Sequence, residues 1–399
     1  PVSAENATQK VFQGSPVINS PAIVGNYPST PFLFYIPTSG ERPMKWSAVK
    51  LPKGLNLDTE TGIISGTVTE KGDYTVTLKA KNTQGVCERK FIIRIGDELL
   101  LTPPMGWNSW NTFGRHLTEE LVLQTADAMI ANGMRDLGYS YINIDDFWQL
   151  PERGTDGHLQ IDRRKFPRGI KYVADYLHER GFKLGIYSDA ADRTCGGVCG
   201  SYGYEEVDAK DFASWGVDLL KYDYCNAPAG RVEAMERYAK MGKALRATNR
   251  SIVFSICEWG QREPWKWAKQ VGGQLWRVSG DIGDVWYRDA NHIGGLRGIL
   301  NILEINAPLG EYAGPAGWND PDMLVVGIGG KSMSIGYESE GCNQEQYNSH
   351  FILWCMMASP LLCGNDVRNM NDSTLHVLLD ADLIAINQDV LGRQAERSI

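Results

Sequence analysis

The chain has 399 residues, of which 43% are hydrophobic and 22% charged, as in a folded globular protein rather than a disordered one. Its net charge of −8 argues against a binder of nucleic acid or of an anionic membrane. No apolar run reaches the roughly 18 residues that a membrane span needs. The length suggests two or three domains.

Residues 1–98 are predicted to form an all-β domain. Turn clusters such as residues 37–40 (PTSG) separate short runs in which polar and apolar side chains alternate. In the run 74–80 (YTVTLKA), Tyr, Val, Leu and Ala share one face, which predicts a strand with one buried side. Residues 51–66 (LPKGLNLDTETGIISG) and 72–77 (GDYTVT) resemble the immunoglobulin-like modules of many bacterial surface and carbohydrate-active proteins. The resemblance implies a small β-sandwich, either a spacer or a binding module.

Residues 99–399 are predicted to form a second, α/β domain. A hinge at residues 96–104 comes first, and its three leucines, Leu99 to Leu101, are expected to pack between the domains. Thr118 is a candidate N-cap for the first long helix. Eight β/α units favour a (β/α)8 TIM barrel, with a doubly wound sheet as the alternative. The β runs are residues 105–110, 141–146, 183–189, 217–223, 251–257, 275–281, a weaker one at 311–320, and 360–366.

Five of these runs end in an aspartate. Polar residues at the carboxyl ends of barrel strands build active sites, whereas a single Asp there can simply cap the next helix. Five together favour a pocket lined by carboxylates, although one or two can be caps. The residues are Asp146, Asp189, Asp223, Asp281 and Asp366.

Asp223 and Asp281 are the first candidates for chemistry. The strand period places Lys221 on the same side as Asp223, and a lysine beside a carboxylate keeps it ionised, which suits a nucleophile. Arg277 has the same parity as Asp281. Two carboxylates across a pocket are what glycoside hydrolysis needs, one to attack and one to protonate the leaving oxygen. A salt-bridge network would leave a similar pattern.

Seven ordered motifs resemble glycoside hydrolase family 27, the α-galactosidases and their relatives, over residues 102–394. The motifs are TPPMGWNSW at 102–110, IDD at 144–146, KLGIYSD at 183–189, DLLKYDYC at 218–225, CEWG at 257–260, GWNDPDM at 317–323 and INQDVLG at 386–392. The resemblance implies a retaining hydrolase that releases terminal α-linked galactose from oligosaccharides or polysaccharides. It implies no metal and no organic cofactor.

The resemblance also implies a role for each matching residue. Asp223 would be the nucleophile and Asp281 the general acid/base, with Asp284 as a weaker rival for the acid. Asp145 and Asp146 would hold the 4- and 6-hydroxyls of the sugar. The remaining contacts would be Trp110, Tyr187, Lys221, Cys257, Glu258, Trp259, Arg277, Asp322 and Met323. Trp107 is more simply a core residue, and Asp189 and Asp366 can be structural.

Cys195 and Cys225 resemble the family's disulfide beside the pocket, with Cys199 as a rival partner. Such a bridge would imply an oxidising compartment. We therefore expect a bacterial protein of the periplasm or exterior. The chain starts at Pro1 without a signal-peptide pattern, so either a signal has been removed or the sequence is part of a longer chain.

Members of the family differ in the group that they accept at the sugar's 2-position. The bulk of residues 257–260 (CEWG) favours a free 2-hydroxyl over an acetamido group, hence galactose rather than N-acetylgalactosamine. Two short carboxylates at Asp145 and Asp146 argue against β-L-arabinopyranosidase activity. A non-catalytic carbohydrate-binding barrel is the remaining alternative. Residues 261–265 and 327–342 depart from the family pattern and leave the aglycone preference open, and the family's usual C-terminal β-domain is not seen before Ile399.

Overall fold

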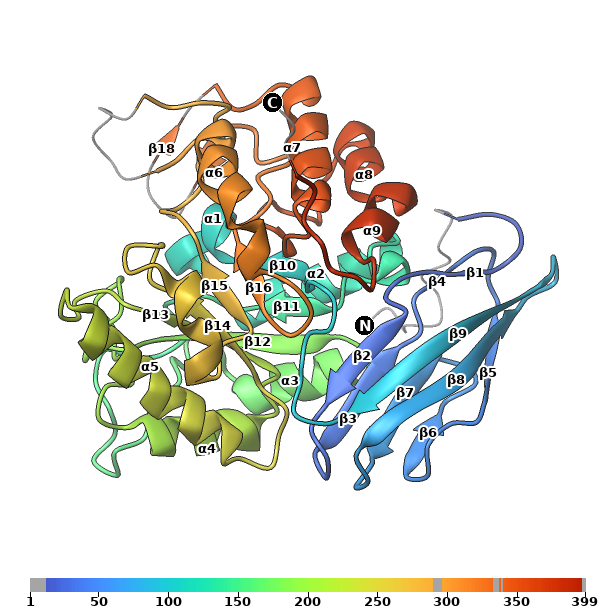
Figure 1. The fold of residues 1–399 in the computed structure, drawn as a ribbon, viewed down its shortest axis with the longest axis horizontal. Helices are drawn as coiled ribbons and strands as arrows, with labels where there is room; N and C mark the ends of the chain where they lie inside the picture. Colours follow the sequence, from blue (N-terminus) through green and yellow to red (C-terminus); the bar gives the residue numbers. More distant parts are fainter. Residues whose placement is uncertain (1–11, 290–295, 333–336, 339, 397–399) are drawn as a thin grey trace.

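The computed structural model describes residues 12–289, 296–332, 337–338 and 340–396. It consists of a strand-rich N-terminal module, blue to cyan in Figure 1, and a larger barrel with helices around it. Each part has its own cluster of buried hydrophobic side chains. The division between residues 98 and 99 stays a prediction.

The N-terminal module is a β-sandwich. One sheet has the strand order β2-β9-β8-β5 and the other β3-β7-β6, and β1 pairs with β4. In β8, Val76, Leu78 and Ala80 are buried, which confirms the alternation expected for residues 74–80. The strands are β1 (Val17–Ile18), β2 (Ile23–Asn26), β3 (Pro31–Tyr35), β4 (Thr38–Ser39), β5 (Lys45–Val49), β6 (Leu55–Leu57), β7 (Ile63–Thr67), β8 (Gly72–Lys81) and β9 (Val86–Ile95).

The second part is a (β/α)8 barrel. Eight parallel strands follow one another in the order β10, β11, β12, β13, β14, β15 and β16, with β19 on the other side of β10. All eight runs expected from the sequence contain one of these strands. The strands are β10 (Met105–Asn108), β11 (Tyr141–Asn143), β12 (Lys183–Asp189), β13 (Leu219–Asp223), β14 (Val253–Cys257), β15 (Leu275–Arg277), β16 (Trp318–Asp320) and β19 (Leu361–Cys363).

The sheet closes on itself just beyond β16. Leu324 forms a parallel bridge with Cys363, because its N–H donates to the carbonyl of Leu362 at 2.8 Å and its carbonyl accepts from Gly364 at 2.9 Å. A doubly wound sheet reverses its strand order and stays open, whereas here chain order and spatial order agree around the ring. The barrel prediction is therefore confirmed and the doubly wound alternative is wrong.

Helices surround the barrel between the strands. Thr118 caps α2 as expected, since its hydroxyl accepts from the Leu121 N–H. A short antiparallel pair of strands, β17 (Lys331–Ser332) and β18 (Tyr337–Glu338), lies in the unfamiliar 327–342 segment, beside α1. The helices are α1 (Trp110–Phe113), η1 (Gly114–His116), α2 (Glu119–Ala131), η2 (Arg135–Leu137), α3 (Ile170–His178), α4 (Glu205–Trp215), α5 (Arg231–Arg246), η3 (Pro264–Lys266), η4 (Ala268–Val271), α6 (Ile299–Asn306), η5 (Ala307–Tyr312), α7 (Gln344–Met356), α8 (Asp372–Leu378) and α9 (Ala381–Asn387).

The module covers the end of the barrel at which the strands begin. At this junction Asp136 is only 1% exposed, and its two oxygens accept from the Tyr35 hydroxyl and from Arg42 Nη2, both at 2.7 Å. Leu99 and Leu100 lie in the junction, as the sequence predicted. An apolar cluster there joins Tyr27 and Leu99 to the first residues of five barrel strands, Tyr141, Leu219, Val253, Leu275 and Trp318.

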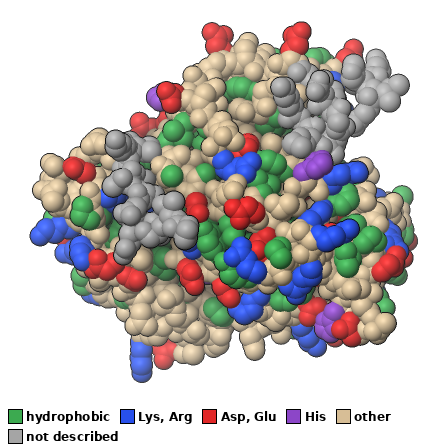
Figure 2. Space-filling model, turned by 180° about the vertical axis from the view of Figure 1, so that it is seen from behind, with side chains coloured by type: hydrophobic (Ala, Val, Ile, Leu, Met, Phe, Trp, Pro, Cys, Tyr) green, Lys and Arg blue, Asp and Glu red, His purple; other side chains and the backbone are tan. Residues whose placement is uncertain are grey.

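A cavity of about 250 Å³ also lies at this junction, far from the carboxyl ends of the strands. Its acidic group, Asp218, is already bonded to Arg250 at 2.6 Å and to His178 at 2.7 Å. The active site is therefore expected at the opposite end, where barrel enzymes place it. Within the described residues, none of the helices is long and apolar enough to cross a membrane. On the face shown in Figure 2, acidic and basic side chains are interspersed.

Candidate active site

Most of the predicted carboxylates lie at the carboxyl ends of the barrel strands. Asp223 is the last residue of β13 and pairs in register with Asp189, the last residue of β12. Asp145 and Asp146 follow β11 directly, and Asp281 comes four residues after β15. Parallel strands bring these ends together at one rim of the barrel. Predicted residues from four strands therefore share one end of the fold.

Asp223 is held rigidly in a buried position. It is 5% exposed, and its two oxygens accept hydrogen bonds from the Tyr187 hydroxyl at 3.0 Å and from the Tyr224 N–H at 3.0 Å. Burial raises the pKa of Asp223 to about 6; the charge of Lys221 opposes the rise and that of Asp281 adds to it. Near neutral pH the carboxylate is mostly ionised and has a fixed orientation, as a nucleophile requires.

Lys221 has a different hydrogen-bond partner from the one that the sequence suggested. Its ammonium donates to Asp145 Oδ2 at 2.8 Å, so it bonds to a residue from two strands away rather than to Asp223. Asn108 donates to the same oxygen at 3.0 Å, and the Ser109 hydroxyl accepts from the Asp145 N–H. Lys221 still lowers the pKa of Asp223 through space, but the effect of burial is larger. The lysine therefore orients Asp145 and only moderates the protonation of Asp223.

Asp146 joins the β11 end to the loop after β12. Its oxygens accept from the Phe147 N–H at 2.8 Å and from the Gly196 N–H at 2.9 Å, and burial raises its pKa. A Cβ on Gly196 would lie 2.3 Å from the Phe147 ring, so only glycine allows this approach. Trp110 lies parallel to that ring, with the centroids 6.2 Å apart. Its own ring is half-buried, as an aromatic sugar platform would be.

Asp281 differs from Asp223 in its exposure, because 46% of its side chain is accessible. Arg277 donates to Asp281 Oδ1 at 3.0 Å and also lies 2.9 Å from Asp322 Oδ2. Asp322 is buried, and the N–H groups of Ile282 and Met323 donate to its two oxygens. One arginine thus links the exposed carboxylate to a fixed one. Asp281 can meet water and a departing oxygen, which an acid/base must do.

Asp284, the rival candidate for the acid, has a structural role. Its oxygens accept from the Tyr347 hydroxyl at 2.7 Å and from the N–H groups of Gly330 and Cys342. These bonds tie the loop after β15 to α7 and to the segment before it. A carboxylate used in this way is not free to exchange a proton with a substrate, so the geometry favours Asp281.

A small cavity of about 30 Å³ in the barrel brings several predicted residues together. Its lining includes Lys221, Cys257, Arg277, Asp322 and Met323. Among the described residues that line this cavity, Glu258 does not occur. Glu258 Oε2 instead accepts hydrogen bonds from the N–H and Nη1 of Arg262. Burial raises the pKa of Glu258 to about 7. Trp259 follows with a left-handed φ of 58°, a strained backbone that bends the chain at the rim.

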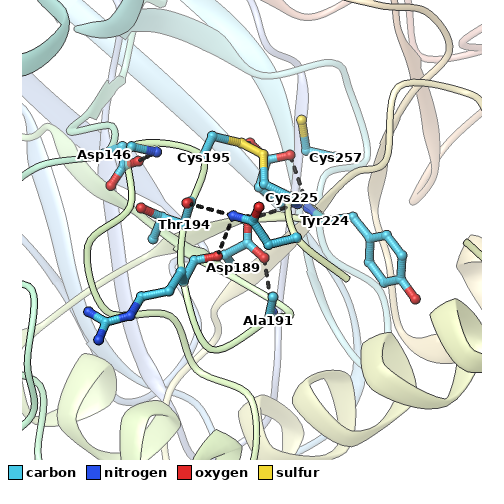
Figure 3. The surroundings of a disulfide bond; sticks show 12 residues. Asp146, Asp189, Ala191, Thr194, Cys195, Tyr224, Cys225 and Cys257 are labelled. Atoms are coloured by element: carbon cyan, nitrogen blue, oxygen red, sulfur yellow. Dashed lines mark hydrogen bonds between the residues drawn. A yellow bond between two sulfur atoms is a disulfide. The ribbon is translucent and has the colours of Figure 1, made fainter. Parts of the chain in front are cut away.

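The predicted disulfide between Cys195 and Cys225 is present, and Cys199, the rival partner, is a buried free thiol. Figure 3 shows the bridge beside Asp189, whose oxygens accept from the N–H groups of Cys225 at 3.0 Å and Ala191 at 2.9 Å. The bridge connects the loop after β12 to the end of β13. The bridge therefore holds in place both Asp223 and the loop whose Gly196 N–H donates to Asp146.

Asp189 is the main residue that the sequence reasoning left aside. It is fully buried next to Asp223, and burial together with the Asp223 charge raises its pKa to about 9. Its position at the end of a strand was visible in the sequence, but its closeness to Asp223 depends on the register of β12 and β13. Asp366 is structural, because Arg368 and Asn369 donate to it, and Trp107 is a core residue as expected.

A barrel whose carboxyl end holds one buried and one exposed carboxylate, with further hydroxyl acceptors around them, is the arrangement of a glycoside hydrolase. The family model described as Alpha galactosidase A matches residues 102–389, and an Ig domain model matches residues 15–96. The chain belongs to the alpha galactosidase A family.

Individual relatives agree with this assignment. Alpha-galactosidase A of Cellvibrio japonicus is 47% identical over 304 residues, which are 76% of this chain and 71% of that protein. The crystal structure of a protein of Bacteroides fragilis, assigned as an α-galactosidase, is 85% identical with a TM-score of 0.95, covering 98% of this chain and 82% of that one.

More distant structures differ in what they support. The α-galactosidase of Saccharomyces cerevisiae, solved with raffinose, is 39% identical with a TM-score of 0.69 and covers 75% of this chain and 67% of that one. A β-L-arabinopyranosidase of Geobacillus stearothermophilus is 23% identical with a TM-score of 0.61, covering 72% of this chain and 76% of that one, and supports the fold alone.

Proposed function

We propose that the chain is a retaining α-galactosidase in which Asp223 is the nucleophile and Asp281 the general acid/base. The contrast between these two carboxylates carries the proposal: one is buried, ionised and fixed by two hydrogen bonds, and the other is exposed and held by Arg277. Family membership supports the same assignment.

The reaction takes two steps. Asp223 Oδ attacks the anomeric carbon while Asp281 gives its proton to the departing glycosidic oxygen, and a galactosyl ester of Asp223 forms. Asp281, now a carboxylate, takes a proton from water as the water attacks the anomeric carbon and releases the ester. Two inversions leave the anomeric configuration unchanged. Arg277 donates a hydrogen bond to Asp281 and orients its side chain.

The other predicted residues bind the sugar. Asp145, oriented by Lys221 and Asn108, and Asp146, oriented by Gly196, accept the 4- and 6-hydroxyls. Ionised acceptors give strong, directional hydrogen bonds, and so they select the axial 4-hydroxyl of galactose. Trp110 supplies the apolar platform. The remaining contacts are Tyr187, Lys221, Cys257, Trp259, Arg277, Asp322 and Met323.

Glu258 acts by fixing the backbone turn that follows it and not by contacting the sugar. Its bond to Arg262 fixes the turn that carries Trp259. The bulk of residues 257–260 (CEWG) leaves little room for an acetamido group at the 2-position. We therefore assign galactose rather than N-acetylgalactosamine. The substrates would be galactose-containing oligosaccharides or polysaccharides. The disulfide and the immunoglobulin-like module suit a periplasmic or extracellular bacterial protein.

A panel of p-nitrophenyl glycosides tests the proposal: α-galactoside, N-acetyl-α-galactosaminide, β-L-arabinopyranoside and α-glucoside. We expect the α-galactoside to be hydrolysed fastest and the Asp223→Ala and Asp281→Ala variants to lose most of that activity. Asp366→Ala is the matched control, because Asp366 also follows a barrel strand but bonds to Arg368. Wild-type chain that binds galactose without hydrolysing the panel would instead identify a carbohydrate-binding protein.

A further inference from the structure

The Cys195–Cys225 disulfide lies between two buried carboxylates of the active site. One possible ligand atom from each of Asp189, Cys195, Asp223 and Cys225 lies within 4.8 Å of the other three. Figure 3 shows both sulfurs next to Asp189. Cys195 is exposed, so a small reductant can reach the bond. Two sulfurs and two carboxylates are a ligand set that zinc accepts once the sulfurs are thiolates.

One spacing among these atoms already suits a tetrahedral ion, and one must change. Bonds of about 2.3 Å from zinc to sulfur and about 2.1 Å to oxygen place neighbouring sulfur and oxygen ligands about 3.6 Å apart. Cys195 Sγ lies 3.4 Å from Asp223 Oδ2, so one edge of the tetrahedron already has nearly the required length. Two zinc-bound sulfurs are about 3.8 Å apart, so the sulfurs must part by about 2 Å after reduction.

The charges at this position also favour a cation. Asp189 and Asp223 are both buried and lie opposite each other in the register of β12 and β13, so two carboxylate charges there repel each other. A divalent ion between them would offset this repulsion. The N–H groups of Cys225 and Ala191 already orient the Asp189 carboxylate, as second-sphere donors do around metal ligands.

We propose that the reduced chain binds one Zn²⁺ ion through Cys195, Cys225, Asp189 and Asp223, and that the disulfide abolishes this site in the oxidised chain. A trialkylphosphine can perform the reduction: the S–S bond breaks, phosphorus takes the oxygen of a water molecule as the phosphine oxide, and the two protons of that water end on the two thiols. Zinc then displaces both thiol protons and any proton on Asp189 into solvent.

Zinc bound in this way would inhibit hydrolysis, because it coordinates the Asp223 carboxylate that must attack the sugar. This consequence rests on the proposed function, whereas zinc binding itself does not. Reduction and zinc would therefore act together: the oxidised chain with zinc keeps its activity, and the reduced chain loses activity when zinc is added and regains it with a chelator.

The experiment uses the full chain, oxidised or reduced with phosphine and desalted without air, and titrated with zinc chloride. Equilibrium dialysis with metal analysis gives the stoichiometry. Titration with Cd²⁺ gives an ultraviolet thiolate-to-metal absorption only if thiolates coordinate the ion. A Cys195→Ser/Cys225→Ser variant keeps the six other cysteines and serves as the control. Asp189→Ala keeps both sulfurs and tests the carboxylate. Thermal melting checks that both variants fold.

We expect one tightly bound zinc per reduced chain, none in the oxidised chain, and loss of that ion in the folded double serine variant. A reduced chain that binds no more zinc than the double serine variant overturns the site. If the reduced chain binds one zinc at these residues but hydrolyses the α-galactoside at an unchanged rate, the site stands and the role of Asp223 as nucleophile is wrong.

Discussion

Asp136 is a buried point at which the N-terminal module is attached to the barrel, and Asp136→Ala tests that attachment. The change leaves the Tyr35 hydroxyl without its acceptor and the Arg42 guanidinium without its counter-ion, both of which now lie 2.7 Å from the carboxylate. Removing one partner of a buried ion pair costs about 3–5 kcal/mol. We expect the free energy of unfolding to fall by about that amount.

Asp127→Ala is the matched control for this prediction. Asp127 also pairs with an arginine, Arg180, at 3.2 Å, but 58% of its side chain is exposed. Exposed pairs contribute at most about 1 kcal/mol. Denaturant unfolding followed by tryptophan fluorescence measures both variants. If Asp136→Ala destabilises the chain no more than Asp127→Ala does, the module is not held to the barrel as described.

Three further predictions concern the active site. As pH falls, kcat/KM should drop with a midpoint near 6, where Asp223 becomes protonated. Lys221→Met removes a charge that lowers the pKa of Asp223, so the midpoint should move to higher pH. An unmoved midpoint would contradict the charge effect of Lys221. Asp281→Asn should slow release of a poor leaving group, such as a sugar, far more than release of p-nitrophenolate, since only the sugar needs a proton; equal losses on both substrates would exclude the acid role. The pKa of Asp189 is about 9 in the folded chain and about 4 in the unfolded chain, so the free energy of unfolding should fall as pH rises from 6 to 9. The slope of that fall should be smaller in Asp189→Asn. An equal slope in the variant would argue against a protonated Asp189.

The barrel could be predicted because its signals are local. Each strand is a short apolar run, and several end in an aspartate whose position along the strand is readable from the sequence. Parity placed Lys221 on the side of Asp223, and the charge effect on Asp223 agrees with that. Parity could not show that Asp145, two strands away, would be its hydrogen-bond partner, because such contacts depend on the curvature of the closed sheet.

Two of the contacts that sequence reasoning missed join distant segments, and a third lies within one loop. Arg277 meets Asp322 because β15 and β16 pair with Arg277 opposite Asp320. Asp189 meets Asp223 through the register of β12 and β13. Glu258 was expected at the sugar, but its side chain bonds to Arg262, one turn further along the chain. A strand's period fixes which side a residue faces, whereas register and loop geometry decide what it touches.

The covalent intermediate gives the most direct test of the central claim. A slow 2-deoxy-2-fluoro-α-galactosyl substrate should let the galactosyl-enzyme accumulate, and peptide mass spectrometry after an acid quench should find the sugar on Asp223. We predict one sugar per chain, on the β13 peptide that carries Asp223. A label on any other carboxylate, or an active enzyme that forms no ester and first releases β-galactose, would contradict the account.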